Sequence, residues 1–284
     1  MKKIMVPVDF SKCSVKALDY AASLAKKING RIILIHADQT SFIPSEAPYE
    51  FIARQIKEEE QNSIHKLKKL AEKVTLQNKV KCSFFCKQGS SVDAILECAE
   101  TEKPDWIVMG TKGASGISEI VLGSNTAKVI AKTAYPVIAV PEKASIGRIS
   151  KIAYATDYHL NDLNSLRHLV KLAKMVGAEI EVVHVTDGEH RVKMEKDLLN
   201  DFKKNVDRKI LYKNISYHLA FGKTVEKTLE QFVKKQSADL LAVSTHHRNL
   251  FDHLFGSSIA KTIIFHSKIP LLAFHYRKDP VILI

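Results

Sequence analysis

Residues 3–11, KIMVPVDFS, decide the fold because they return at residues 151–159 as KIAYATDYH. This match places Asp9 against Asp157, an offset of 148 residues, and RIILIHAD from Arg31 returns at the same offset as EIEVVHVT from Glu179. Self-similarity over so long a stretch means that one fold occurs twice in the chain.

The later segments repeat as well, at a smaller offset. PDWIVMGT from Pro104 returns as ADLLAVST from Ala238, and Gly123 matches Gly256, an offset of 133 residues. The second copy is therefore 148 − 133 = 15 residues shorter between its second and third strands, where the first copy has the loop DQTSFIPSEAPYE. Two domains are predicted, residues 1–144 and 149–284, joined by a linker within EKASIG.

Within each copy, short β-branched runs alternate with amphipathic helical stretches, which is typical of a parallel sheet covered on both faces. We predict an α/β fold made of two doubly wound five-stranded parallel sheets. In the first copy the expected strands are residues 3–8, 32–37, 80–87, 106–110 and 137–140, and the expected helices are residues 14–28, 51–74, 92–102 and 124–133.

The composition indicates an ordinary globular protein. The 284 residues carry a formal net charge of +12, which could attract a polyanion, but acidic residues interrupt the lysine-rich helical stretches, so we expect solvated helix faces and no nucleic-acid partner. No apolar run is long enough for a membrane span, and the first ten residues reach Asp9 too soon for a signal peptide, so we expect a cytoplasmic location. The four cysteines form no C-x-x-C pair and favour neither disulfides nor a zinc site.

Ligands of doubly wound sheets bind beyond the carboxyl ends of the strands. At these ends stand Pro7, Val8 and Asp9 after the first strand, and Ala37 after the second. After the fourth strand comes a glycine-rich loop that leads into a helix, with the spacing Gly110-x2-Gly113-x9-Gly123-Ser124.

This loop could cradle phosphates. Glycine lets a backbone approach a ligand closely, and the first N–H groups of a helix favour an anion. Backbone N–H groups of Gly123, Ser124 and Asn125, with the hydroxyls of Ser124 and Thr126, would supply the donors. The alternative is structural, since Gly-Ser is a common helix cap and glycine a common turn residue. The combined spacing favours the phosphate site.

The loop, together with VPVDFS at the end of the first strand, resembles the ATP-binding type of the universal stress protein family, and the resemblance covers nearly the whole chain twice. It implies a Rossmann-like, adenine nucleotide α-hydrolase-like fold. It also implies roles for matching residues: Val8 and Asp9 beside adenine and ribose, Ala37 offering backbone groups to adenine, Gly110 and Gly113 lining the triphosphate, and Gly123, Ser124, Asn125 and Thr126 holding it. Because Asp9 would repel a triphosphate, Mg²⁺ is the expected companion of ATP.

The second copy departs from this pattern. Its loop reads Ser244-Thr245-His246-His247, so both leading glycines are replaced, and its spacer before Gly256-Ser257 is one residue shorter. We expect one competent nucleotide site per chain, in the first copy. Asp157, Gly256 and Ser257 are the residues that could still take part in the second.

Three further patterns favour structural roles. Gly222-Lys223-Thr224 lacks the earlier glycine of a P-loop and aligns with the turn at Gly89, which predicts a turn and helix cap. A metal site is not predicted at His246, His247, His253 and Asp252, because no pair among them has the i, i+4 spacing that would hold two ligands rigidly on one face of a helix. His36 and His184 recur at matching strand ends, which predicts a structural role for both.

The leading functional hypothesis is a regulatory stress-response protein that binds ATP. Slow ATP hydrolysis is one alternative, because a bound triphosphate with a metal needs only a positioned water, although no dedicated catalytic base is apparent. A scaffold for another small molecule or a protein partner is a second alternative. The resemblance also implies an internal pseudo-dimer, in which residues 137–140 pair with residues 271–274. The tail HYRKDPVILI would cover a sheet edge or contact another chain, as in a homodimer.

Overall fold

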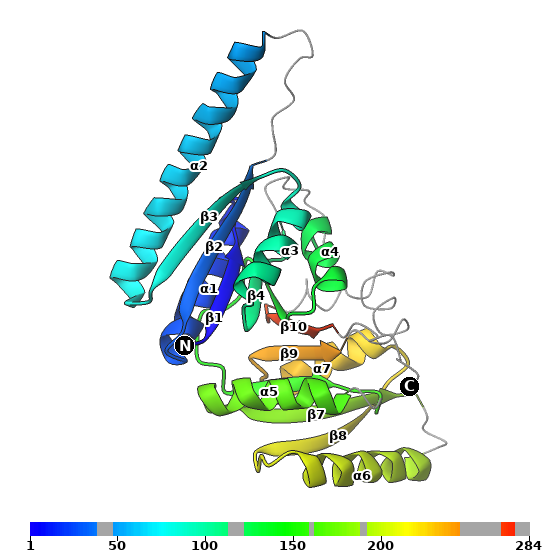
Figure 1. Cartoon of the computed structure of the whole chain (residues 1–284). Coiled ribbons are helices and arrows are strands. Elements are labelled where there is room, and N and C mark those ends of the chain that lie inside the picture. Colours follow the sequence, from blue (N-terminus) through cyan, green and yellow to red (C-terminus); the bar gives the residue numbers. More distant parts are fainter. Residues whose placement is uncertain (39–47, 113–121, 159–161, 188–191, 245–267, 276–284) are drawn as a thin grey trace, which may run out of the picture.

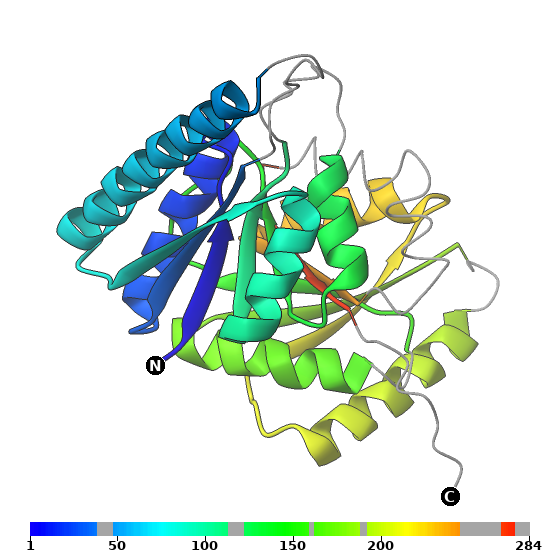
Figure 2. The same ribbon diagram turned by 45° about the horizontal axis from the view of Figure 1, so that its top comes forward.

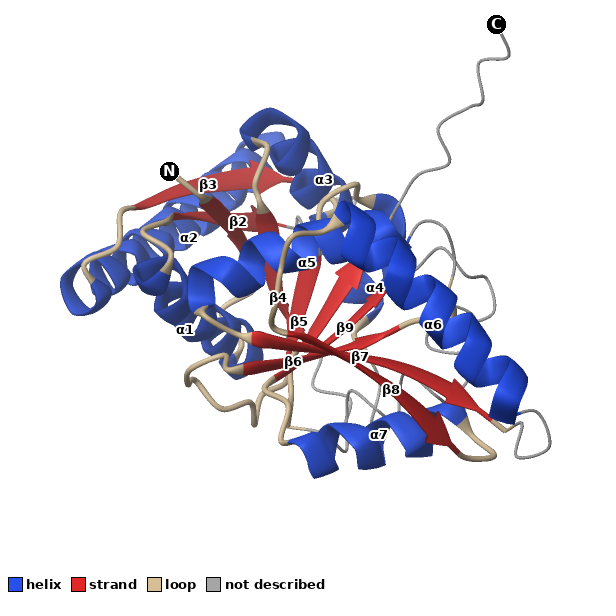
Figure 3. Cartoon of the chain, turned by 90° about the horizontal axis from the view of Figure 1, so that it is seen from below, coloured by secondary structure: helices blue, strands red, loops and turns tan. Residues whose placement is uncertain are grey.

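In the computed structural model, the described strands form one continuous twisted sheet, in the order β3-β2-β1-β4-β5-β10-β9-β6-β7-β8 (Figure 1 and Figure 3). The structure describes residues 1–38, 48–112, 122–158, 162–187, 192–244 and 268–275. The strands are β1 (Lys3–Pro7), β2 (Arg31–Asp38), β3 (Cys82–Gln88), β4 (Trp106–Gly110), β5 (Val137–Val140), β6 (Lys151–Ala155), β7 (Glu179–Thr186), β8 (Ile215–Phe221), β9 (Leu240–Ser244) and β10 (Leu271–Phe274).

Each half of this sheet is parallel and doubly wound. β1 pairs with β2 on one side and with β4 on the other, and β6 pairs in the same way with β7 and β9. The strand order therefore reverses direction beside the first strand of each half, which is where doubly wound sheets leave room for a ligand. The predicted α/β class and the two five-stranded halves are confirmed.

Helices cover both faces of the sheet. The buried apolar side chains form two clusters, one beneath α1, α2, α5 and α6 and the other beneath α3, α4 and α7 (Figure 2). No described helix has the length and apolar character that a bilayer span requires. The helices are α1 (Lys12–Lys27), α2 (Tyr49–Asn78), α3 (Ser91–Glu102), α4 (Ser124–Lys132), α5 (Asp162–Val176), α6 (Val192–Lys209) and α7 (Val225–Gln236).

The two halves join through their last strands. β5 and β10 pair antiparallel, with Ile138 opposite Leu272 and both side chains fully buried. The pairing that was predicted between these strands is confirmed, and its consequence is that the two five-stranded sheets become one sheet of ten strands. The edges that would otherwise expose unpaired backbone groups are thereby removed from the centre of the molecule.

The length difference between the copies lies mainly in a helix. α2 has 30 residues and α6 has 18, so most of the missing residues are helical rather than part of the loop where we expected them. Figure 1 shows the extra turns of α2 extending past the end of the sheet. The predicted region, between the second and third strands, is confirmed, and only its assignment to the loop was wrong. A loop rich in proline marks where a helix begins but says nothing about how far the equivalent helix extends in the other copy.

Other boundaries agree closely with the sequence pattern. β4 and β5 match the predicted ranges residue for residue, and β3 begins at Cys82 rather than at Val80. The Gly222-Lys223-Thr224 segment is a turn with Thr224 at the N-cap of α7, and Gly222 donates its N–H to the Thr186 carbonyl as Gly89 does to Asp38. All four cysteines are free thiols.

Candidate nucleotide site

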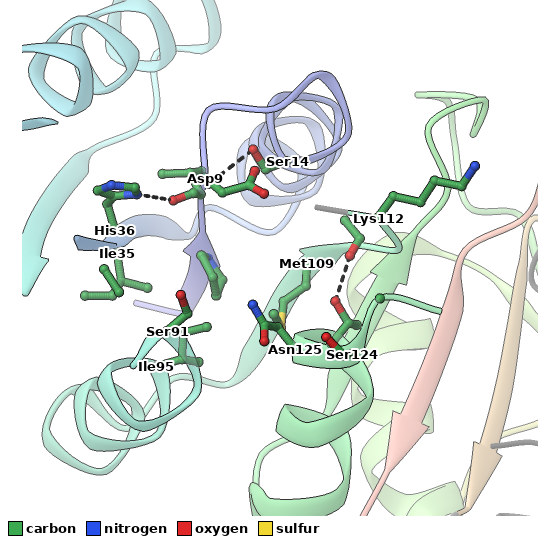
Figure 4. A pocket seen from close by; sticks show the side chains of 16 residues that line it. Asp9, Ser14, Ile35, His36, Ser91, Ile95, Met109, Lys112, Ser124 and Asn125 are labelled. Atoms are coloured by element: carbon green, nitrogen blue, oxygen red, sulfur yellow. Dashed lines mark hydrogen bonds between the residues drawn. The ribbon is translucent and has the colours of Figure 1, made fainter. Parts of the chain in front are cut away.

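A recess of about 700 Å³, measured out to its open mouth, lies at the carboxyl ends of β1, β2 and β4 in the first half of the chain (Figure 4). Nine of the ten residues expected at the site line this recess, and the tenth, Gly113, lies outside the described residues. The lining consists of Pro7, Val8, Asp9, Ser14, Ile35, His36, Ala37, Ser91, Ile95, Met109, Gly110, Lys112, Gly123, Ser124, Asn125 and Thr126.

The turn after β1 is held by hydrogen bonds from two other elements. Val8 donates its N–H to the Ile35 carbonyl at 2.9 Å, and the Nδ1 atom of His36 lies 2.7 Å from the Val8 carbonyl oxygen. Asp9 donates its N–H to the Ser14 hydroxyl, and Phe10 adopts a left-handed φ of 62°. The second half repeats this backbone conformation at its equivalent position, so the turn belongs to the fold itself.

The carboxylate of Asp9 caps its own turn at the edge of the recess. Its Oδ1 atom accepts the N–H of Ser11 at 3.1 Å, and Ser11 is in turn the N-cap of α1, with its side chain accepting from Ser14. The sequence Asp-Phe-Ser thus forms a short Asx-type turn that leads directly into a helix. This arrangement directs a negative charge toward whatever occupies the recess.

The N-terminus of α4 forms the opposite wall. Gly123 is the N-cap residue, with extended backbone, and its own N–H is donated to the Thr111 carbonyl at 2.7 Å. The next three N–H groups, those of Ser124, Asn125 and Thr126, have no acceptor within the helix. Since Ser124 and Asn125 are exposed, the helix start offers donors to an anion in the recess.

Two of the expected donors are used within the protein. The Thr126 hydroxyl, which we expected to bind phosphate, is buried and donates to the Gly110 carbonyl at 2.8 Å. The N–H of Gly123 is likewise occupied by Thr111. Thr126 therefore fixes the start of α4 against the end of β4, and only its backbone N–H remains for a ligand.

Gly110 and Gly123 lack a side chain for two different reasons. A Cβ atom on Gly110 would lie 2.9 Å from the backbone and the sulfur of Cys13, so α1 packs where a side chain would be. A Cβ atom on Gly123 would lie 3.2 Å from the Thr111 carbonyl oxygen, and its other neighbours would be at ordinary contact distances of 3.7 and 3.8 Å. Gly110 is thus required by the packing of α1 on β4. Gly123, which has no side chain, leaves the space in front of the N-terminus of α4 open.

A polar cluster centred on Asp38 contacts His36 on the side away from the recess. Asp38 accepts from the Ser63 hydroxyl at 2.7 Å and from the Cys86 thiol at 3.2 Å, and its Oδ1 atom is 3.0 Å from Nε2 of His36. Burial, the hydrogen bond to Asp38 and nearby carboxylates raise the pKa of the Cys86 thiol to about 12. The cluster therefore holds a protonated, unreactive thiol and anchors His36 from the side away from the recess.

His36 and His184 make the same bond in the two halves. In the second half, Nδ1 of His184 lies 2.8 Å from the Thr156 carbonyl oxygen, which corresponds to Val8. Each ring also packs on the aromatic residue of the following turn, with centroids 4.4 Å from Phe10 and 4.3 Å from Tyr158. This repeated contact gives both histidines a structural role, although His36 also lines the recess.

Sequence reasoning missed seven lining residues: Ser14, Ile35, His36, Ser91, Ile95, Met109 and Lys112. Ser91 had a usable signal, because it follows β3 and the carboxyl ends of parallel strands meet at one edge. Lys112, which follows β4, had the same signal. The other five residues lie within strands and helices, so the contacts between elements decide which of them reach the recess. In Figure 4 the stem of Lys112 lies at the rim and its ammonium group points away from the recess.

The corresponding loop of the second half lies mostly outside the described residues. Gly256 and Ser257 are in this part, as are His246, His247, His253 and Asp252 of the hypothetical metal group. Asp157 is described and stands at the end of β6 as Asp9 stands at the end of β1. Among the described residues there is no group of three histidine, cysteine or acidic side chains placed to hold a metal ion.

Comparison with known proteins agrees with the fold. The model of the universal stress protein family matches residues 1–141 and again residues 148–275. A universal stress protein of Methanocaldococcus jannaschii, MJ0531, is 37% identical over 142 residues, covering 49% of this chain and 81% of the relative.

Solved structures of the family include a universal stress protein from Archaeoglobus fulgidus, with a TM-score of 0.72 at 18% identity, covering 96% of this chain and 98% of that one. A universal stress protein solved in complex with cAMP is 25% identical, with a TM-score of 0.36, over 50% of this chain and 97% of its own. The chain belongs to the universal stress protein family and carries two of the family's domains in tandem.

Proposed function

We propose that the first half of the chain binds ATP in the recess at the ends of β1, β2 and β4, and that the protein acts in stress regulation through this bound nucleotide. The observation that carries the proposal is the pairing, in one recess, of an apolar wall with the N-terminus of α4. A nucleotide needs both, because its base is apolar and flat while its phosphates are anionic.

The two walls are on different sides of the recess. Figure 4 shows Ile35 and Ile95 on one side and Ser124 and Asn125 on another, with Met109 between them. A purine ring would pack against the apolar side chains, and the phosphates would reach the three free N–H groups of the helix. Ser91 lines the recess where ribose or ring nitrogens would find a hydrogen-bond partner. The Ser14 hydroxyl also lines it, but it donates to the Ser11 carbonyl at 3.0 Å and accepts from the N–H of Asp9.

Asp9 is the charge that such a ligand must accommodate. Its carboxylate lines the recess, and a divalent cation between this carboxylate and the triphosphate would remove their repulsion. Mg²⁺ commonly binds through one or two carboxylates together with substrate phosphates and water, and does not need a cage of protein ligands. Asp9 would be the residue that holds it, so the affinity for ATP is expected to rise when Mg²⁺ is present.

The test is calorimetric titration of the whole chain with ATP, AMP and cAMP, each with and without Mg²⁺. We expect one site per chain for ATP. The variant Asn125→Asp keeps the size of the side chain and places a negative charge at the start of α4, so it should weaken ATP binding by at least about tenfold. Asn62→Asp, on the exposed face of α2, is the matched control and should bind as the parent does.

Two results would overturn the proposal. One is a folded parent protein that shows no heat and no rise in melting temperature with any of the three nucleotides, since a ligand at 100 times its Kd should add about 2.7 kcal/mol of stability. The other is equal ATP affinity in Asn125→Asp and in the parent, which would place the nucleotide elsewhere. Mass spectrometry of nucleotide released from freshly purified protein would identify the form that is carried.

A further inference from the structure

The histidine near the end of the second strand of each half lies between two groups that accept hydrogen bonds. In the first half, Nδ1 of His36 is 2.7 Å from the Val8 carbonyl oxygen, and Nε2 is 3.0 Å from Oδ1 of Asp38. A carbonyl oxygen can only accept, so Nδ1 carries a hydrogen. A second hydrogen lies between Nε2 and the carboxylate, because two acceptors this close would repel each other without one. His36 and Asp38 therefore share a proton.

The second half builds the same arrangement from different side chains. Nδ1 of His184 is 2.8 Å from the Thr156 carbonyl oxygen, and Oε2 of Glu195 lies 3.6 Å from Nε2, which is the distance of an ion pair. Glu195 is on α6, whereas Asp38 is on β2. A carboxylate thus lies behind the histidine in both halves, although a different element of the fold supplies it.

A hydroxyl group has exchanged places with this carboxylate. The strand position that is Asp38 in the first half is Thr186 in the second, at the offset of 148 residues. In the first half Ser63 of α2 donates to Asp38 at 2.7 Å, and in the second half Thr186 donates to Glu195 of α6 at 3.3 Å. Both halves keep one carboxylate in contact with one hydroxyl, with their places on strand and helix reversed. The negative charge beside the histidine is therefore the common feature.

The pair in the first half lies beside the nucleotide recess and is largely shielded from water. His36 lines the recess, and its side chain and that of Asp38 are each 13% exposed. The two carboxylate oxygens also accept from the Ser63 hydroxyl and the Cys86 thiol. Hydrogen bonds to charged groups are strong where little water competes, so this network fixes the ring. Figure 4 shows the ring of His36 bonded to the turn that carries Asp9.

We infer that the proton shared with Asp38 makes His36 a positioning residue for the bound nucleotide. The inference rests on the proposed function of the first half. With hydrogens on both nitrogens, the ring keeps donating from Nδ1 to the Val8 carbonyl and so fixes the turn that carries Asp9. A neutral ring has one hydrogen, and the tautomer that places it on Nε2 would direct a lone pair at that carbonyl. The end of β1 would then move relative to the N-terminus of α4, and the two walls of the recess would no longer fit one ligand.

The test transfers the arrangement of the second half into the first, in the full chain. Asp38→Thr removes the carboxylate and should weaken binding of Mg-ATP by at least about tenfold, because a charge-assisted hydrogen bond is lost. Asp38→Thr combined with Ser63→Glu restores a carboxylate from α2, as Glu195 supplies one from α6, and should bind within about threefold of the parent. Asp38→Thr combined with Asn62→Glu is the matched control, since it adds the same charge on the exposed face of α2 and should not restore binding.

Nitrogen-15 NMR of the imidazole ring gives a readout that does not depend on the nucleotide. In the ligand-free parent both ring nitrogens of His36 are expected to carry hydrogen, whereas in Asp38→Thr only one should do so. The double variant with Ser63→Glu should regain the second hydrogen. If Asp38→Thr does not fold, Asp38→Asn replaces it in the same comparison, alone and combined with Ser63→Glu, because asparagine has the size of aspartate.

The outcomes separate the inference from the proposed function. Parent protein that does not bind ATP refutes both. If the parent binds ATP, the inference alone is refuted by unchanged affinity in Asp38→Thr, by a single hydrogen on the His36 ring of the parent, or by equal recovery with Asn62→Glu and Ser63→Glu. It is also refuted by a double variant that regains the ring hydrogen without regaining affinity. Loss of both in the single variant, and return of both with Ser63→Glu, supports it.

Discussion

Gly110 and Gly123 lack a side chain for different reasons. Gly110 is fully enclosed, and the backbone of Cys13 occupies the position that its Cβ atom would need. Gly123 has an extended backbone that any residue can adopt, and a Cβ atom there would come closest to the Thr111 carbonyl oxygen, at 3.2 Å. A substitution at Gly110 therefore tests the packing of α1 on β4, while one at Gly123 or Asn125 tests ligand binding.

Gly110→Ala is expected to destabilise the protein even without ligand. The added methyl group would lie 2.9 Å from backbone atoms that cannot rotate away, and overpacking of this kind costs about 1–3 kcal/mol. Urea unfolding of the ligand-free protein measures the loss. Gly147→Ala is the matched control, since a Cβ atom there would come no closer than 3.5 Å to the hydroxyl of Ser145. Unchanged stability in both variants would contradict the packing argument.

Among the elements, α2 is unevenly supported along its length. From Ser63 onward it buries a stripe formed by Ser63, Leu67, Ala71 and Val74 at helical spacing. Between Glu50 and Asn62 no described side chain is buried, and Phe51 is 57% exposed. Packing supplies most of the stability of a helix within a protein, so the first turns of α2 depend mainly on their own propensity.

Amide hydrogen exchange should therefore divide α2 into two parts. Residues 50–60 are expected to exchange at least about 100-fold faster than residues 66–76, because they open without disturbing the core. Mass-spectrometric or NMR exchange of the ligand-free chain measures this difference, and α6, which buries Phe202 and Val206, provides an internal comparison. Uniform protection along α2 would contradict this prediction, because it would mean that contacts other than those of the buried stripe protect the first turns of the helix.

Across the whole molecule, the pairing of β5 with β10 is expected to couple the unfolding of the two halves. Ile138 and Leu272 face each other across it, and the core cluster beneath α1 and α5 contains buried residues of both halves. The single tryptophan, Trp106, is buried in the first half and reports on that half alone. Cooperative unfolding is expected when so much of the core is shared.

Leu272→Ala is expected to destabilise both halves together. Removing this fully buried side chain should cost about 2–5 kcal/mol, and the urea midpoint reported by Trp106 fluorescence should fall by as much as the midpoint reported by far-UV circular dichroism. Leu211→Ala, at a residue that is 88% exposed, should move neither. A fall seen by circular dichroism without one in Trp106 fluorescence would mean that the halves unfold independently.

The sequence by itself determined the tandem organisation, the α/β class and most of the strand boundaries, whereas the pairing of the last strands was implied by the family resemblance. These features depend on local patterns: a repeat at offsets of 148 and then 133 residues, and β-branched runs such as β4 and β5 that stand between helical stretches. It also pointed to the edge of the sheet where the recess lies, because the carboxyl ends of parallel strands must meet there.

Only the tertiary structure decided how that edge is built. It showed that Gly110 accommodates Cys13, that the Thr126 hydroxyl is donated to a carbonyl group, and that Ser14 and Ser91 join the recess. It also placed the length difference in α2. Each of these features depends on contacts between residues far apart in the chain. A hydrogen-bond partner, a cavity wall or a close approach of two backbones cannot be read from a local sequence pattern, because another element of the fold supplies the second residue.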